Sequence, residues 1–144
     1  MEWVCLKNSK SIFLKPLKEN VTLHTVILRA TASEWALRKI LTEEGCIVET
    51  ADDGVACIDM IEKAGADYYK LILMDIQMPV MNGYDAALAI RKMKDAKKSR
   101  IPIIAMTANV FAENIQKVLS VGMNDHVAKP VDMNILVPTM MKYL

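Results

Sequence analysis

The sequence has few cysteines and no apolar run long enough to cross a membrane. Cys5, Cys46 and Cys57 are odd in number, lack C-x-x-C spacing and have no paired histidines beside them. This argues against a disulfide framework or a zinc site and favours a reducing compartment, so we expect a cytoplasmic protein. A membrane span requires about 20 apolar residues, and the first residues lack a signal-peptide layout. We therefore expect no membrane contact by this segment.

The sequence also lacks an excess of charge of either sign. It has 18 Lys and Arg against 17 Asp and Glu, a net charge of +1. That balance gives no electrostatic reason to expect a nucleic-acid partner. Its 144 residues are 53% hydrophobic and 24% charged, which is typical of one compact domain with a real core.

Short apolar runs alternate with amphipathic stretches along most of the chain. The predicted strands are Thr25–Leu28, Cys46–Thr50, Leu71–Met74, Ile101–Ala105 and His126–Ala128. The predicted helices are 33–44, a helix capped by Asp52 or Asp53 that ends near Ala64, 84–94, 111–121 and 132–144. Continuously apolar strands separated by single helices indicate a parallel sheet covered on both faces. The prediction is an α/β fold: a doubly wound (βα)5 sandwich whose five-stranded parallel sheet has the flavodoxin-like order 2-1-3-4-5.

Two segments stand outside this repeat. Residues 1–24 do not fit it, and we interpret them as a linker or an N-terminal extension that precedes a domain over residues 25–144. The stretch Lys94–Arg100 is basic, and we expect it to be a solvated connection.

Three polar residues each follow an apolar run at the end of a predicted strand: Asp75, Thr107 and Lys129. Taken singly, Asp75 is explained by a turn cap, Thr107 by a capping hydroxyl and Lys129 by a solvated lysine. In a parallel sheet, however, all three converge on one edge. There a carboxylate is a nucleophile toward phosphoryl groups, a hydroxyl hydrogen-bonds a phosphate oxygen, and an ammonium neutralises phosphate charge. The joint pattern favours phosphate chemistry.

At these positions the sequence resembles the receiver domains of two-component signalling, in particular those of hybrid histidine kinases and phosphorelays. The motifs that carry the resemblance are MDIQMPVMNG at Met74–Gly83, AMTAN at Ala105–Asn109 and GMNDHVAKP at Gly122–Pro130. The resemblance implies that Asp75 accepts a phosphoryl group from a phosphohistidine of a histidine kinase or a histidine phosphotransfer protein. Thr107 and Lys129 would then hold the phosphate.

The same resemblance implies further residues. Asp75 and the backbone carbonyl of Gln77 would help to hold Mg²⁺. His126 stands at the family's aromatic switch position, with Thr107 as the other switch residue, although His126 is equally explained as a surface histidine. The bond between Lys129 and Pro130 is expected to be cis.

One part of the family's pattern is missing. Receiver domains carry an acidic pair at the end of the first strand of the sheet, and Leu28 and Arg29 stand there instead. Because Mg²⁺ prefers oxygen ligands and usually one or two carboxylates, we expect its binding to be weak. Arg29 either points inward and pairs with Asp75 in place of the metal, or swings into solvent.

The leading hypothesis is a phosphoacceptor receiver domain in a phosphorelay that switches protein contacts. The alternative is a degenerate receiver with impaired Mg²⁺ binding that acts as a regulatory or docking domain without phosphorylation. A nucleotide- or flavin-binding enzyme of the same fold is disfavoured because no Gly-rich phosphate loop follows the first predicted strand. Enzyme status stays open: the domain itself is a phosphoacceptor with at most self-phosphotransfer, and a hybrid histidine kinase is one context for it. A homodimer is compatible with the sequence.

Overall fold

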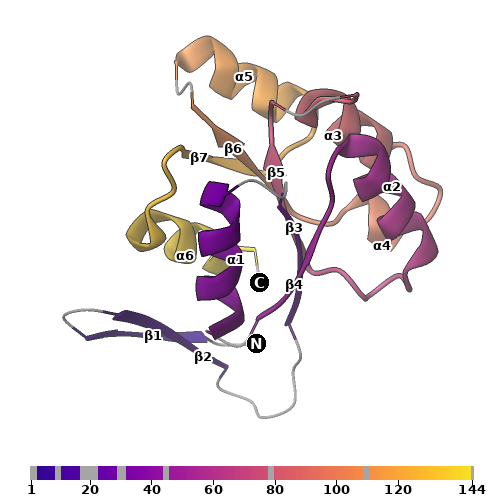
Figure 1. Cartoon of the computed structure of the whole chain (residues 1–144). Coiled ribbons are helices and arrows are strands. Elements are labelled where there is room, and N and C mark those ends of the chain that lie inside the picture. Colours follow the sequence, from indigo (N-terminus) through magenta and orange to yellow (C-terminus); the bar gives the residue numbers. More distant parts are fainter. Residues whose placement is uncertain are drawn as a thin grey trace.

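The structure is a computed structural model that describes residues 3–8, 11–16, 23–28, 32–43, 46–77, 80–108 and 111–143, with side chains from residue 36 onward. In chain order its elements are β1 (Trp3–Asn8), β2 (Ser11–Pro16), β3 (Leu23–Leu28), α1 (Ala32–Glu43), β4 (Cys46–Thr50), α2 (Gly54–Lys63), β5 (Leu71–Asp75), α3 (Gly83–Arg91), α4 (Ala96–Ser99), β6 (Ile103–Thr107), α5 (Ala112–Ser120), β7 (Asp125–Ala128) and α6 (Met133–Met141). Figure 1 shows their arrangement in space.

Strands β3 to β7 form a five-stranded sheet in the order β4-β3-β5-β6-β7. All four neighbouring pairs are parallel. This is the predicted doubly wound sandwich with order 2-1-3-4-5, and the prediction is confirmed. The central strand β5 is buried at every position, from Leu71 to Asp75, as expected for a strand that helices cover on both faces.

Two hydrophobic cores lie on opposite faces of the sheet. Helices α1 and α6 cover one face, whereas α2, α3 and α5 cover the other. Leu41 of α1 and Met140 of α6 are fully buried in the first core, and Ile61 of α2 and Ile90 of α3 are fully buried in the second. The alternation of side chains along each strand therefore divides the apolar residues between two helical layers.

The structure resolves one boundary that the sequence left open between two residues and shifts another. The side chain of Asp53 accepts a hydrogen bond from the N–H of Ala56 at 2.8 Å. Asp53 rather than Asp52 is therefore the N-cap of α2. Strand β6 begins at Ile103 instead of Ile101, since Pro102 has no N–H to donate to the ladder.

The sequence predicts the basic stretch at Lys94–Arg100 to be a solvated connection. In the structure this stretch also contains the short helix α4. Asp95 caps this helix through its Oδ1, which accepts a hydrogen bond from the N–H of Lys97 at 2.9 Å. The capping signal was overlooked because the charge of the segment dominated its interpretation.

Strands β1 and β2 lie within the segment interpreted as a linker or extension. They pair antiparallel, with Leu6 opposite Phe13, and make a separate two-stranded sheet. Strand β3 begins at Leu23, ahead of the predicted Thr25. The division of the chain into residues 1–24 and 25–144 stays a prediction.

Arg91 joins the two connections that lead into the amino ends of β6 and β7. Its Nε donates to the carbonyl of Gly122 at 2.8 Å, and its Nη1 donates to the carbonyls of Ser99 at 2.7 Å and Ile101 at 2.8 Å. Its Nη2 donates to Oδ1 of Asn124 at 2.9 Å. Gly122 has a φ of +90°, and a β-carbon there would lie 2.8 Å from Cγ of Arg91. The position therefore requires glycine on both counts.

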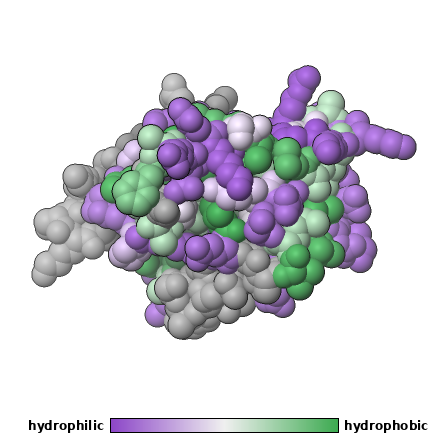
Figure 2. Space-filling model, turned by 90° about the horizontal axis from the view of Figure 1, so that it is seen from above, coloured by the Kyte–Doolittle hydropathy of each residue, from purple (hydrophilic) through white to green (hydrophobic). Residues whose placement is uncertain are grey.

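The surface of the described residues mixes polar and apolar side chains. Figure 2 looks down onto the side of the molecule that carries α5, where hydrophobic groups form separate patches between hydrophilic ones. Leu119 of α5 is 55% exposed, and single exposed hydrophobic residues of this kind are common on protein surfaces. Among the described residues, no helix is both long and apolar enough to cross a membrane.

Candidate functional site

Asp75 is a buried carboxylate at the carboxyl end of the central strand. Its residue is 4% exposed, and both of its side-chain oxygens have partners. Oδ1 accepts a hydrogen bond from the N–H of Gln77 at 2.9 Å, and Oδ2 accepts one from Nζ of Lys129 at 2.7 Å. A buried carboxylate requires such compensation, because an unpaired charge is costly to desolvate.

The turn that follows β5 holds the Asp75 backbone against the first turn of α3. The N–H of Gly83 donates to the carbonyl of Ile76 at 3.0 Å, and Asn82 caps α3 through the N–H of Asp85 at 2.9 Å. A β-carbon on Gly83 would lie 2.5 Å from the carbonyl oxygen of Asp75. Glycine therefore allows an approach that every other residue would block.

Thr107 and Lys129 meet beside Asp75 through the register of the sheet. Asp75 pairs with Met106 on β6, so Thr107, the last residue of that strand, lies just beyond the end of β5. The carbonyl of Thr107 accepts a hydrogen bond from the backbone N–H of Lys129 at 2.9 Å. Thr107 is 8% exposed. Three strands thus deliver a carboxylate, a hydroxyl and an ammonium to one edge of the sheet.

The bond between Lys129 and Pro130 is cis, the isomer that the resemblance implies. His126 lies on β7 opposite Ala105 of β6, and its side chain is 29% exposed. Its Nδ1 is 3.8 Å from Oδ1 of the adjacent Asp125. The structure therefore places His126 beside Asp125, and the assignment of His126 as a switch residue stays a prediction.

The described residues do not offer a complete magnesium site. The part of the chain with described side chains holds no group of three or more His, Cys, Asp or Glu placed to bind a metal. Leu28 is the last residue of β3, where the family has an acid, and Arg29 lies outside the described residues. Asp75 and the carbonyl of Gln77 remain as donors, and the ammonium of Lys129 already contacts Oδ2. This donor set falls short of the oxygen coordination that Mg²⁺ prefers.

Sequence reasoning overlooked two contributors to the site. The N–H of Gln77 supports the carboxylate of Asp75, although only the Gln77 carbonyl was considered. The sequence motif that contains Gly83 does not by itself show that this glycine allows the close approach to Asp75. The signal was available in both cases: a buried carboxylate at a strand end needs a nearby donor, and glycine at a helix start indicates a close backbone approach.

Comparison with known proteins agrees with this geometry. A model of the response regulator receiver domain matches residues 31–140. The chain is 40% identical over 122 residues to "Probable histidine kinase 2" of Oryza sativa subsp. indica, covering 76% of this chain and 12% of that protein. It is 39% identical over 116 residues to "Hybrid signal transduction histidine kinase B" of Dictyostelium discoideum, covering 74% of this chain and 6% of that protein. The chain thus spans about an eighth or less of the length of these relatives.

A solved structure shares the fold over most of the chain. It is the receiver domain of a sensor histidine kinase from Pseudomonas aeruginosa, with a magnesium ion coordinated in its active-site cleft. The TM-score is 0.74 at 28% identity, covering 85% of this chain and 98% of that one. From the matched family model, the strand order and the polar residues at the sheet edge, we conclude that the chain belongs to the response regulator receiver domain family of two-component signalling.

Proposed function

We propose that this receiver domain takes a phosphoryl group from a phosphohistidine onto Asp75 and thereby changes its protein contacts. The observation that carries the proposal is the ion pair between Asp75 and Lys129 at 2.7 Å. It presents an ionised carboxylate, held by the N–H of Gln77, next to a cation that can neutralise phosphate charge.

The bonds that change in this step belong to the carboxylate of Asp75 and to the phosphohistidine of the donor. A carboxylate oxygen of Asp75 attacks the phosphorus of the donor's phosphohistidine, the new O–P bond forms and the P–N bond breaks. The histidine nitrogen leaves with the electron pair and takes a proton. Lys129 offsets charge on the equatorial oxygens, as cations do in phosphoryl transfer. Thr107, at the end of β6, donates a hydrogen bond from its hydroxyl to an oxygen of the bound phosphoryl group.

The proposed output follows from the same contacts. Phosphorylation replaces the single negative charge of the Asp75 carboxylate by a phosphoryl group with a charge of about −1.5 to −2. The ammonium of Lys129 can then bind phosphoryl oxygens as well as Oδ2 of Asp75. When it does so, the connection from β7 to α6, which carries Lys129, moves with it. The partners we propose are a histidine kinase, in the same or another polypeptide, or a histidine phosphotransfer protein. A cytoplasmic location fits such partners.

The residue at the end of β3 favours a second candidate function, that of a degenerate receiver. Leu28 lies where the family has an acid, and the described side chains include no group of three or more His, Cys, Asp or Glu placed to bind a metal. The ammonium of Lys129 already supplies a positive charge at Oδ2. In this alternative Mg²⁺ binds weakly, Asp75 is not phosphorylated efficiently, and the domain regulates or docks independently of phosphorylation.

The deciding experiment measures the intact mass of the protein after incubation with acetyl phosphate, with and without Mg²⁺. The Asp75→Asn variant is the control. One phosphoryl adduct on the wild type and none on the control supports the phosphoacceptor function. No adduct on the folded wild type, together with an adduct on the Leu28→Asp, Arg29→Asp double variant, supports the degenerate receiver. An adduct that persists in Asp75→Asn contradicts the assignment of Asp75.

A further inference from the structure

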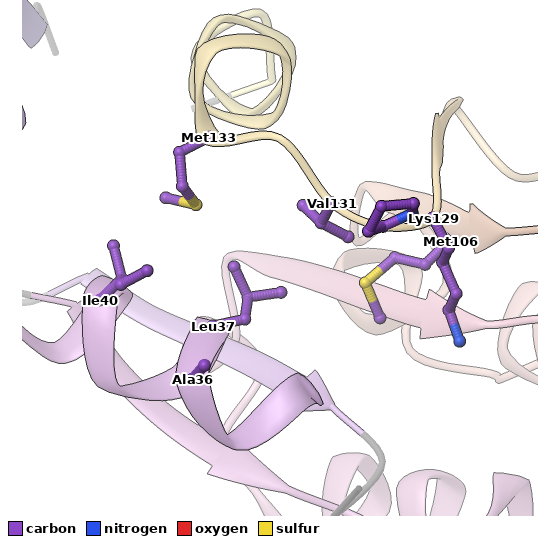
Figure 3. Close-up of a pocket in the computed structure, with 8 residues that line it drawn as sticks. Ala36, Leu37, Ile40, Met106, Lys129, Val131 and Met133 are labelled. Carbon is purple, nitrogen blue, oxygen red and sulfur yellow. The ribbon is translucent and has the colours of Figure 1, made fainter. Parts of the chain in front are cut away.

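A ligand-sized apolar cavity lies between α1 and the connection from β7 to α6. Its volume is about 490 Å³, within the range of about 300–1,000 Å³ that is usual for small-molecule sites. The described residues that line it are Ala36, Leu37, Ile40, Met106, Lys129, Pro130, Val131 and Met133. Figure 3 shows Leu37 and Ile40 projecting from α1 toward Val131 and Met133 on the opposite side, with Met106 of β6 at one end, beside Val131.

The lining indicates the charge of a ligand. Of the eight described residues around the cavity, only Lys129 is charged. Its ammonium is 2.7 Å from Oδ2 of Asp75, and Figure 3 shows the end of the side chain directed away from the cavity. A charged ligand would lose its hydration here and meet mainly apolar groups, which is unfavourable. An uncharged apolar molecule gives up little favourable hydration on entering the cavity, and its binding removes apolar surface from water.

The cavity shares its wall with the groups that contact Asp75. Lys129, Pro130 and Val131 are consecutive residues of one connection; the first carries the ammonium bound to Asp75. Met106 directly precedes Thr107 in β6 and pairs with Asp75 in the sheet. The residue that contacts Asp75 and two residues that line the cavity therefore belong to one short stretch of backbone.

We propose that this cavity binds a small, uncharged, apolar molecule, and that its occupancy is coupled to the contact between Asp75 and Lys129. Since coupling between two sites is reciprocal, a ligand that favours one position of the connection also biases the state of Asp75. The binding goes beyond the proposed phosphoacceptor function and does not require that Asp75 be phosphorylated.

The test uses phenylnaphthylamine, an uncharged probe whose fluorescence rises in apolar surroundings, titrated against the full chain. Ala36 is exposed on α1 and lines the cavity, so Ala36→Trp fills it from the edge. Thr42 is exposed on the opposite side of the same helix, which makes Thr42→Trp the matched control. Ile40→Trp, at a residue that is 39% exposed, serves as a second filling variant, and thermal unfolding checks that each variant folds.

We expect the wild type and Thr42→Trp to bind the probe equally. Ala36→Trp and Ile40→Trp should raise its dissociation constant by about tenfold or more, equivalent to about 1.4 kcal/mol. Equal binding by folded filling variants, or no fluorescence rise with the wild type, overturns the site. Tighter binding of the anionic analogue anilinonaphthalene sulfonate overturns the assignment of an uncharged ligand. A dimer that Ala36→Trp dissociates would show that a second copy of the chain covers the cavity, and it also overturns the proposal.

The coupling has its own readout. Asp75→Asn removes the charged partner of Lys129, and we expect it to change the dissociation constant of the probe by about fivefold or more, the lower end of the usual range for couplings between sites. An unchanged constant overturns the coupling while leaving the site intact. Because none of these measurements involves a phosphoryl donor, failure of the phosphoacceptor function is seen separately, in the mass experiment.

Discussion

Asp75 and Lys129 form an ion pair whose two partners are buried to different degrees. The side chain of Asp75 is 4% exposed and that of Lys129 is 31% exposed. Lys129→Ala leaves a buried carboxylate without its counter-charge, and we expect a loss of about 2–3 kcal/mol in the free energy of unfolding. Asp75→Asn leaves an ammonium that water can solvate, so the loss should be about 1 kcal/mol or less.

Urea unfolding at pH 7 measures both losses. Lys142→Ala is the control, because Lys142 is 66% exposed and 3.9 Å from Asp125, and it should change stability by no more than about 0.5 kcal/mol. An equal or larger loss for Asp75→Asn than for Lys129→Ala would contradict the asymmetry.

Gly83 should tolerate no side chain. A β-carbon there meets the carbonyl oxygen of Asp75 at 2.5 Å and the Cα of Ile76 at 2.9 Å, so backbone has to move. We expect Gly83→Ala to lower the free energy of unfolding by about 1–3 kcal/mol. Gly65→Ala is the matched control, since a β-carbon at Gly65 has nothing within 4 Å. Similar chemical denaturation midpoints for the two variants would refute the close approach.

Arg91 should be one of the more costly polar residues to remove. Its guanidinium donates to the carbonyls of Gly122, Ser99 and Ile101 and to Oδ1 of Asn124, and its burial lowers its pKa. Arg91→Ala leaves these acceptors without the donor, so we expect a loss of about 3 kcal/mol or more. Arg91→Lys should recover only part of it, because a lysine lacks the planar fork.

Thermal unfolding checks the prediction for Arg91. Arg100→Ala, at an exposed arginine nearby, is expected to leave the unfolding temperature nearly unchanged. If Arg91→Ala were as stable as Arg100→Ala, the bonds to Arg91 would contribute nothing.

Cys57 should be unreactive in the folded protein. It is fully buried, and this burial raises the pKa of its thiol to about 12, so almost no thiolate is present at pH 8. Cys46 is also buried. In a Cys5→Ser background we expect iodoacetamide to add no mass at pH 8 until urea unfolds the chain, when both thiols react. Rapid alkylation of the native protein would show that the core opens easily.

The order and type of the core elements could be predicted from the sequence because the physical pattern is local. Cys46–Thr50 was placed correctly from a short apolar run between turn residues, and β4 has these bounds. The end of β6 could not be predicted in the same way. Whether Thr107 belongs to the strand depends on its pairing with Ala128 of β7, which lies far away in the sequence. Strands β1 and β2 were overlooked because they break the alternation that located the other elements.

The site could be predicted in its composition but not in its contacts. Right-handed crossovers and parallel strands placed Asp75, Thr107 and Lys129 on one edge. That Lys129 pairs with Asp75 depends on the path of the chain through Pro130, and that Gln77 supports the carboxylate depends on the turn after β5. Whether Arg29 lies near Asp75 concerns a residue outside the described part of the chain, and the two alternatives for it remain as the sequence left them.

The hydrogen bonds of Arg91 anchor the amino ends of two strands, β6 and β7. They tie together the connections that lead into β6 and β7, and Oδ1 of Asn124 also accepts the N–H of Ile103 at 2.9 Å. One side chain thus anchors the amino ends of these two strands, whereas the contacts at their carboxyl ends include the ion pair between Lys129 and Asp75. A phosphoryl group on Asp75 acts on that ion pair, at the end of the strands that Arg91 does not contact.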